Sequence, residues 1–169
     1  ADNVELPVQV TIASGFPKGD KLELITQKAT ELGASQIWAF PADWSVAKWD
    51  GKKLGKKVEK LEKIALGAAE QSKRNHVPSI TLFEKKANFL AQFDQFDRIV
   101  VAYEESAKEG ESAALIQVVA GLEKGAKLLF IFGPEGGLSP AEIESFEAKG
   151  AILAGLGPRI LRAETAPLY

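Results

Sequence analysis

The sequence predicts an α/β domain built on a mostly parallel sheet with helices on both faces. Short apolar, β-branched runs alternate with helical patterns along the whole chain, which is the order that parallel sheets require. The run "AKLLFIFG" is continuously apolar, as is typical of a central parallel strand. No repeat, low-complexity tract or Pro/Ser-rich linker divides the 169 residues, so one domain over residues 1–169 is expected.

Composition supports a folded domain and excludes several kinds of site. Hydrophobic residues make up 46% and charged residues 26% of the chain, which is enough to bury a core in water. The net charge is −2, so any contact with nucleic acid must come from a local patch. There is no cysteine and one histidine, which excludes disulfides and disfavours a metal site. No apolar run could span a bilayer and no leader opens the chain, so we expect a cytoplasmic protein.

The first half of the chain predicts two strands and two helices. A β-branched run at residues 8–14 ends at a glycine and predicts a strand. The next stretch, "GDKLELITQKATELG", predicts a helix with Asp20 as N-cap and Gly33 as its end. A second strand is expected at residues 35–40. A long amphipathic pattern predicts a helix at roughly residues 55–75.

The second half continues the alternation. The expected elements are a strand at 79–83, a helix at 87–93, a strand at 97–103, a helix at 111–122, a strand at 126–133 and a last strand at 151–157. Before the last strand, Ser139 is a candidate N-cap, Pro140 suits the first helical position, and Glu142 completes a capping box. These three residues predict a helix that extends to about residue 149.

Three loops follow strands at what would be the carboxyl edge of the sheet, where ligands of such folds usually bind. They contain "YEES", "GPEGGLS" and "GLGPRILRAET". The glycines taken singly are explained equally well by tight turns. Two Gly/Pro loops with charged residues after neighbouring predicted strands favour a binding site instead. Neither loop is a P-loop or a G-x-G-x-x-G phosphate motif, which disfavours a nucleotide-phosphate enzyme.

Four stretches of the chain resemble a known family. "GPEGGLSPAEIE", "LGPRILRAETA", "PKGDKLELITQKATELG" and "KIALGAAEQSKRN" are similar to the bacterial ribosomal RNA (uracil-N3)-methyltransferases of the SPOUT superfamily. The resemblance implies methylation of uridine N3 in small-subunit (16S) ribosomal RNA with S-adenosylmethionine as cofactor. It also implies a C-terminal trefoil knot, which is a rare exception among folds, and a homodimer for the complete protein.

The resemblance places the cofactor at the three strand-end loops. Adenosylmethionine needs backbone groups, apolar walls and close main-chain approach, and no phosphate nest. The implied cofactor-binding residues are Tyr103, Glu104, Gly133, Pro134, Glu135, Gly136, Gly137, Leu156, Gly157, Ile160 and Leu161.

The same resemblance implies a catalytic role for charged residues of the last loop. Uridine N3 carries a proton, so the uracil must lose it and the developing anion must be stabilised. We expect Arg162 to stabilise that anion, Arg159 to share the task or hold a phosphate, and Glu164 to orient one of them. The alternative is that Arg159 and Glu164 form an ion pair that only holds the loop. The sequence does not assign the proton acceptor.

Contacts with RNA are expected elsewhere in the chain. The resemblance marks Glu70, Gln71, Arg74 and Asn75 as lining the substrate side, although polar residues at a helix end can equally be capping groups. A second candidate is the lysine-rich pattern of Lys52, Lys53, Lys56, Lys57, Lys60 and Lys63. Interspersed glutamates make an ordinary solvated helix face the favoured interpretation of these lysines.

The chain also departs from the family. Trp44 and His76 stand where the family more often has arginine; Trp44 and Trp49 could stack on bases or be partly buried aromatics. Nothing corresponds to the family's PUA-like RNA-binding domain or to its final helix, and methionine is absent, so a catalytic part of a longer or processed chain is expected. A catalytically silent RNA-binding or ribosome-assembly module on the same scaffold is the alternative function.

Overall fold

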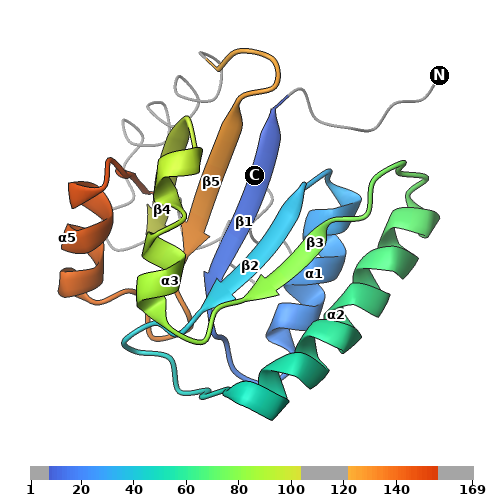
Figure 1. Ribbon diagram of the computed structural model, residues 1–169, viewed down its shortest axis with the longest axis horizontal. Helices are drawn as coiled ribbons and strands as arrows, with labels where there is room; N and C mark the ends of the chain where they lie inside the picture. The colour runs from blue at the N-terminus through green and yellow to red at the C-terminus, as the bar shows by residue number, and fades with distance from the viewer. Residues whose placement is uncertain (1–7, 104–121, 156–169) are drawn as a thin grey trace.

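A computed structural model describes residues 8–103 and 122–155, which form a six-stranded parallel sheet between two layers of helices (Figure 1). The strands are β1 Gln9–Gly15, β2 Gln36–Phe40, β3 Ser79–Leu82, β4 Arg98–Tyr103, β5 Lys127–Phe132 and β6 Ile152–Gly155. The helices are α1 Lys21–Glu31, α2 Gly51–Gln71, α3 Lys86–Leu90, the 3₁₀ turn η1 Phe93–Gln95, and α5 Pro140–Ala148. The predicted fold class is confirmed for this part of the chain. The predicted knot and nearly all of the helix expected at residues 111–122 lie outside the described residues.

The strand order is β3-β2-β1-β5-β4-β6, and every pairing is parallel. The chain therefore adds β2 and β3 on one side of β1, and then crosses to place β4, β5 and β6 on the other side of β1. The direction in which strands are added thus reverses between β1 and β5. Strand β4 lies between β5 and β6, which separates the two strands that the sequence had suggested as neighbours. All strands end at the same edge, which is the lower one in Figure 1.

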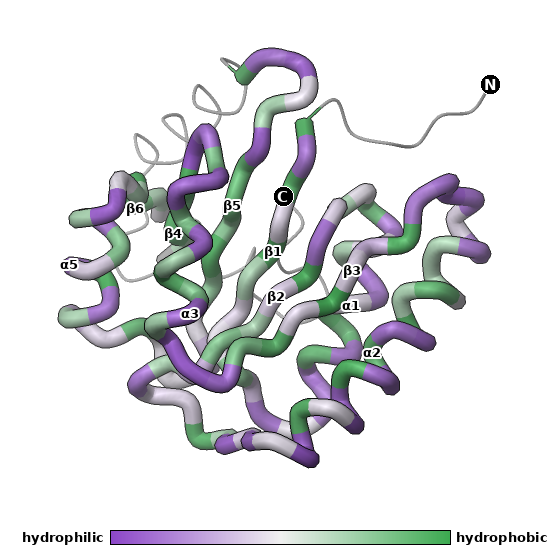
Figure 2. Tube along the Cα trace, viewed as in Figure 1, coloured by the Kyte–Doolittle hydropathy of each residue, from purple (hydrophilic) through white to green (hydrophobic). Residues whose placement is uncertain are grey.

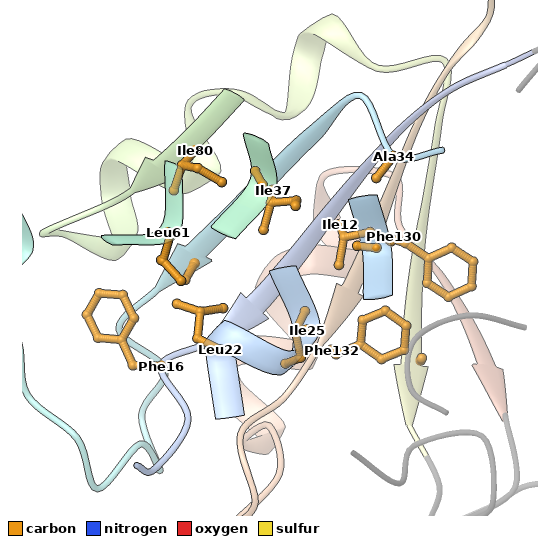
Figure 3. Packing of buried hydrophobic residues seen from close by; sticks show 14 of the residues in the cluster. Ile12, Phe16, Leu22, Ile25, Ala34, Ile37, Leu61, Ile80, Phe130 and Phe132 are labelled. Atoms are coloured by element: carbon orange, nitrogen blue, oxygen red, sulfur yellow. The ribbon is translucent and has the colours of Figure 1, made fainter. Parts of the chain in front are cut away.

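Each face of the sheet is covered by its own apolar cluster, because side chains of successive strand residues point to opposite faces. On one face, Ile12, Ile37 and Phe130 pack with Leu22 and other residues of α1 and α2 (Figure 3). The other face packs against α3, η1 and α5 through an aromatic group made of Trp38, Phe40, Phe89, Phe93 and Phe146. Figure 2 shows hydrophobic residues along the strands and hydrophilic ones recurring along α2. Helices thus cover both faces of the sheet, as predicted.

Helix α2 begins and ends earlier than predicted, and both differences have a local cause. It begins at Gly51 because Asp50 already has the extended backbone of an N-cap residue, at φ −132° and ψ 171°. It ends at Gln71 because Lys73 adopts φ 59°, a left-handed conformation that reverses the chain. The amide of Arg74 then donates to the carbonyl of Ala69 at 2.9 Å and closes the helix end.

Two other helices differ from the predictions in the structure. The helix expected at residues 87–93 is a five-residue helix, α3, followed by the separate turn η1. Asp20 is the N-cap of α1 but makes no capping hydrogen bond with its side chain. Glu23, three residues later, pairs instead with Lys60 of α2 at 3.0 Å. The capping box of Ser139 and Glu142 is confirmed in both directions.

We expect Phe89→Ala to lower the free energy of unfolding by about 3–5 kcal/mol, because it would open a cavity in the aromatic group. Phe89 is fully buried and its ring stacks on Phe40 with centroids 4.3 Å apart. Urea unfolding followed by circular dichroism measures the change. Leu66→Ala on α2 is the control, since Leu66 is 48% exposed and its loss should cost less than about 1 kcal/mol. Equal losses in the two variants would contradict this account of the core.

Candidate functional site

The carboxyl ends of β4, β5 and β6 meet at one edge of the sheet. Ala102 of β4 is in register with Phe132 of β5 and with Ala154 of β6. Neighbouring strands lie about 4.8 Å apart, so the three strands end within roughly 10 Å of one another. The three loops predicted to bind the cofactor therefore start side by side, although only the loop after β5 lies wholly within the described residues.

The loop after β5, residues 133–137, is a tight turn. The amide of Gly137 donates to the carbonyl of Pro134 at 2.8 Å, and Gly137 has φ 85°. A Cβ on Gly133 would lie 3.0 Å from the backbone of Gly137 and Leu138, so a side chain there would press against the turn. Turn formation thus accounts for Gly133 and Gly137. No atom lies within 4 Å of where a Cβ of Gly137 would be, and Gly136 is exposed, so the main chain here is open to a ligand.

The end of β1 packs directly against this loop. A Cβ on Gly15 would lie 2.6 Å from Cδ of Pro134, so β1 and the loop touch without room for a side chain. The amide of Lys18 donates to both carboxylate oxygens of Glu135, at 3.2 and 3.1 Å, and Nζ of Lys21 lies 3.7 Å from the same carboxylate. Glu135, predicted to bind cofactor, is therefore engaged by the segment after β1.

Gly15 and Lys18 were not predicted as part of the site. The sequence does contain a pattern that could have indicated them, because Gly15, Pro17 and Gly19 follow a predicted strand just as the glycines of residues 133–137 do. The sequence does not show that these residues contact the loop after β5, because β1 and β5 are more than a hundred residues apart in the chain.

A polar cluster next to the loop consists of the buried Ser139 and Glu142, the half-buried Lys86 and the exposed Asp43. Glu142 is 2% exposed and accepts hydrogen bonds from the amides of Asp43 at 2.7 Å and Ser139 at 2.9 Å. Nζ of Lys86 lies 2.7 Å from Glu142 and also contacts the Asp43 carboxylate. The Ser139 hydroxyl donates to Asp43 at 2.6 Å. The cluster ties the loop after β2 to α3 and to the start of α5.

The charges in this cluster stabilise one another. The hydrogen bond from Lys86, aided by that from Ser139, lowers the pKa of Asp43 below its ordinary value. Burial by itself lowers the pKa of Lys86, but the hydrogen bonds and charges of Asp43 and Glu142 outweigh burial and raise that pKa above its ordinary value. Both shifts favour the charged forms, so the Asp43 carboxylate and the Lys86 ammonium stabilise each other.

The residues predicted to line the RNA side lie at the other edge of the sheet. Glu70, Gln71 and Asn75 are exposed near the C-terminal end of α2, which leads into the start of β3. Strands of six or seven residues put roughly 20 Å between the two edges. Arg74 is 8% exposed, and its Nη1 donates to the carbonyls of Thr30 and Ala34 at 3.0 Å each. The structure therefore gives Arg74 a role in holding the end of α1.

The remaining predicted residues lie outside the described part of the chain. They are Glu104, Leu156, Gly157, Arg159, Ile160, Leu161, Arg162 and Glu164, and for Tyr103 only the backbone is described. Among residues 8–103 and 122–155, no group of three or more acidic or histidine side chains is placed to hold a metal ion. None of the helices described is long and apolar enough to cross a membrane.

We expect Lys86→Met to lower the free energy of unfolding by roughly 3 kcal/mol at pH 7, because the buried Glu142 would lose its counter-ion. The pKa of Lys86 is raised, so its stabilisation is complete below its ordinary pKa of 10.5 and is lost as the pH rises through the higher folded value. Below pH 3.8 the advantage of the wild type should also shrink, as Asp43, whose pKa is lowered, becomes protonated.

Urea unfolding at several pH values measures both effects. The matched control is Lys85→Met, because Lys85 is the exposed neighbour of Lys86 and forms no ion pair with any described residue. Its replacement should change stability by less than about 0.5 kcal/mol. A pH-independent gap between wild type and Lys86→Met would show that the charge of Lys86 is not what stabilises the cluster.

Comparison with known proteins identifies the family. The model of the RNA methyltransferase domain family matches residues 4–169. The ribosomal RNA small subunit methyltransferase E of Bacillus subtilis is 54% identical over 168 residues, which cover 99% of this chain and 66% of the relative. A Mycobacterium bovis protein of the same name is 30% identical over 93% of this chain and 59% of its own length. The chain thus spans somewhat less than two thirds of these relatives.

Solved structures agree with the sequence relatives. A methyltransferase from Legionella pneumophila, in complex with the cofactor S-adenosylmethionine, is 28% identical with a TM-score of 0.80 over 97% of this chain and 64% of that one. A ribosomal RNA small subunit methyltransferase E from Neisseria gonorrhoeae, bound to S-adenosylmethionine, is 27% identical with a TM-score of 0.76 over the same shares. The resemblance inferred from four short stretches is confirmed, and the chain belongs to the RNA methyltransferase domain family.

Proposed function

We propose that this domain uses S-adenosylmethionine to methylate N3 of a uracil in small-subunit (16S) ribosomal RNA. The observation that carries the proposal is the register of β4, β5 and β6, which brings the starts of the three predicted cofactor loops to one edge of the sheet. Family membership, the names of the relatives and the two cofactor-bound neighbours support the same activity. The resemblance also implies a homodimer for the complete protein and action in the cytoplasm, where bacterial ribosomes lie.

The residues present fit the proposed cofactor. The loop of residues 133–137 presents main chain rather than side chains, with open space at Gly137, and it contains no phosphate-binding motif. Gly133, Pro134, Gly136 and Gly137 would approach the cofactor from β5, and Glu135 would fix the loop through Lys18. Tyr103 and Glu104 would approach from β4. The predicted wall of the cofactor site would be completed by Leu156, Gly157, Ile160 and Leu161.

The chemistry divides between cofactor and chain. When bound, S-adenosylmethionine supplies a methyl group activated by a positively charged sulfur. The chain must hold the uracil so that N3 faces that methyl group, keep water out, and stabilise the negative charge that the base acquires as N3 loses its proton. Arg162 is our candidate for charge stabilisation. Arg159 would share this role or grip a phosphate, with Glu164 orienting one of the two guanidinium groups.

RNA contacts at the C-terminal end of α2 stay predictions. Glu70, Gln71 and Asn75 are exposed and can meet only a part of the RNA that lies about 20 Å from the cofactor loop of the same chain. A folded ribosomal RNA is large enough to reach both edges. Arg74 would act there by supporting its exposed neighbours, because its own guanidinium is buried.

The first test is calorimetric titration of the full-length protein with S-adenosylmethionine and, separately, with ATP. We expect binding of S-adenosylmethionine alone, and at least tenfold weaker binding in Gly136→Val, because the added side chain would crowd both the open loop and Trp44. Gly67→Val is the matched control, since Gly67 has open space around it on α2. Failure of the wild type to bind S-adenosylmethionine would overturn the methyltransferase proposal and favour the silent RNA-binding module.

The second test concerns Arg162. We expect Arg162→Ala to bind S-adenosylmethionine within about twofold of wild type but to methylate small-subunit RNA roughly a hundredfold more slowly, since one stabiliser of the developing anion would be missing. Single-turnover transfer of a labelled methyl group measures the rate. Arg98→Ala is the control, because Arg98 is exposed at the start of β4, far from the carboxyl edge. An unchanged rate in Arg162→Ala would remove this residue from the catalytic group.

A further inference from the structure

Trp44 is an aromatic side chain left exposed beside the cofactor loop. It lies in the segment after β2, at the carboxyl edge, and is 50% exposed. Its backbone carbonyl would lie 3.2 Å from a Cβ on Gly136, so the tryptophan and the loop are in contact. Trp49 differs, because its ring packs on Phe16 with centroids 4.5 Å apart and lies under Nζ of Lys57 at 4.2 Å. Of the two, Trp44 is half exposed and its ring makes no aromatic or cation contact with any described residue, so Trp44 is the better candidate for stacking on a base.

The position of Trp44 is fixed by its neighbours. Asp43, immediately before it, donates its amide to Glu142 and accepts from Lys86 and Ser139 through its carboxylate. Immediately after it, Ser45 donates its amide to the carbonyl of Ala42 at 3.1 Å and accepts from the amide of Ala42 at 3.2 Å. The backbone on both sides of Trp44 is therefore held before any ligand arrives, which lowers the entropic cost of binding.

Positive charge follows Trp44 in the same segment. Residues 48–57 contain five lysines and one aspartate, in a chain whose net charge is −2. The first turn of α2 contains no acidic residue, although the positive end of the helix dipole favours acids and disfavours lysines there. Lys52, Lys53 and Lys56 are exposed and form no ion pair with any described residue. The helix dipole disfavours Lys52 and Lys53 in this turn, whereas a bound polyanion would stabilise all three lysines.

We propose that Trp44, Lys52, Lys53 and Lys56, here called the 44–56 surface, bind an unpaired stretch of RNA. A base stacks on Trp44, and Lys52, Lys53 and Lys56 contact the phosphates of adjoining nucleotides, which is the combination of stacking platform and cationic track that single strands require. The inference rests on the proposed function and deepens it by placing the substrate RNA at the carboxyl edge. There, the stacked base would adjoin the loop of residues 133–137.

This placement differs from the one predicted through Glu70, Gln71, Arg74 and Asn75. Those residues lie at the opposite edge, where Arg74 is buried and Glu70 adds a negative charge. The 44–56 surface reaches the cofactor loop within one chain, and the other edge does not. The main candidate for RNA contact next to the reacting base is therefore the 44–56 surface.

The stacking half of the proposal is tested by the affinity of the full-length protein for a fluorescein-labelled single-stranded RNA of about 20 nucleotides, long enough to cover a usual single-strand site. We expect Trp44→Ala to weaken binding about tenfold and Trp44→Phe to retain most of the affinity, because phenylalanine still stacks. Val46→Ala is the matched control: Val46 is 68% exposed in the same segment but cannot stack, so its affinity should stay within about twofold.

The electrostatic half is tested by salt dependence. Each lost phosphate contact lowers the slope of log affinity against log salt by about 0.7 for single strands, so the triple variant Lys52→Gln/Lys53→Gln/Lys56→Gln should lower it by about 2. The control is Lys73→Gln/Lys124→Gln/Lys149→Gln, which removes three exposed lysines that precede the starts of β3, β5 and β6. This control should leave the slope unchanged.

S-adenosylmethionine titration of each variant separates the inference from the proposed function. Unchanged cofactor binding together with weakened RNA binding supports the inference.

Normal cofactor binding with RNA affinity unaffected in both Trp44→Ala and the Lys52/Lys53/Lys56 variant overturns the inference and leaves the methyltransferase proposal standing. Equal loss in Val46→Ala and Trp44→Ala, or equal competition by fully paired RNA, also overturns it, because either result would exclude stacking on an unpaired base. Absence of cofactor binding with weakened RNA binding would support the surface and overturn the proposed function.

Discussion

The carboxylate of Glu142 is the constraint on which the carboxyl edge depends. A buried charge is costly unless it is paired and hydrogen-bonded, and Glu142 obtains two backbone amides and one ammonium from three separate segments. Asp43 brings the loop after β2, Lys86 brings α3, and Ser139 brings the start of α5. One buried group therefore fixes the mutual position of segments that are distant in the sequence, and Trp44 and the cofactor loop are positioned as a result.

A second constraint is steric and acts at the reversal of strand order. β1 and β5 are neighbours, and the chain leaves them toward opposite faces, to α1 and to α5. Gly15 allows Pro134 to lie against the end of β1, and the amide of Lys18 holds Glu135. In open parallel sheets the crevice at such a reversal is the usual ligand site. The loop of residues 133–137 is thus placed by the topology and fixed by these contacts.

The two edges of the sheet have different roles. At the starts of the strands, Arg74 closes α1 by donating to the carbonyls of Thr30 and Ala34, so its guanidinium serves the fold. The ends of the strands are followed by glycine-rich main chain, an exposed tryptophan, and exposed lysines that form no ion pair with any described residue. This separation explains how one small sheet could support a rigid frame at one edge and ligand binding at the other. It also makes an RNA path along the carboxyl edge the simplest arrangement for methyl transfer.

The sequence by itself determined the local features of this protein. The alternation of strands and helices, the capping box at Ser139 and the family motifs are encoded by residues close together in the chain, so each could be predicted. Helix ends were less predictable, because the left-handed Lys73 that ends α2 has no strong local signal. Only the tertiary structure decided the strand order, the burial of Arg74, the partners of Glu135 and the ion pairs of Lys86. The contacts of these residues join positions about 40 to 117 apart in the chain. Such long-range contacts depend on how helices and strands pack, and short-range sequence patterns contain no record of that packing.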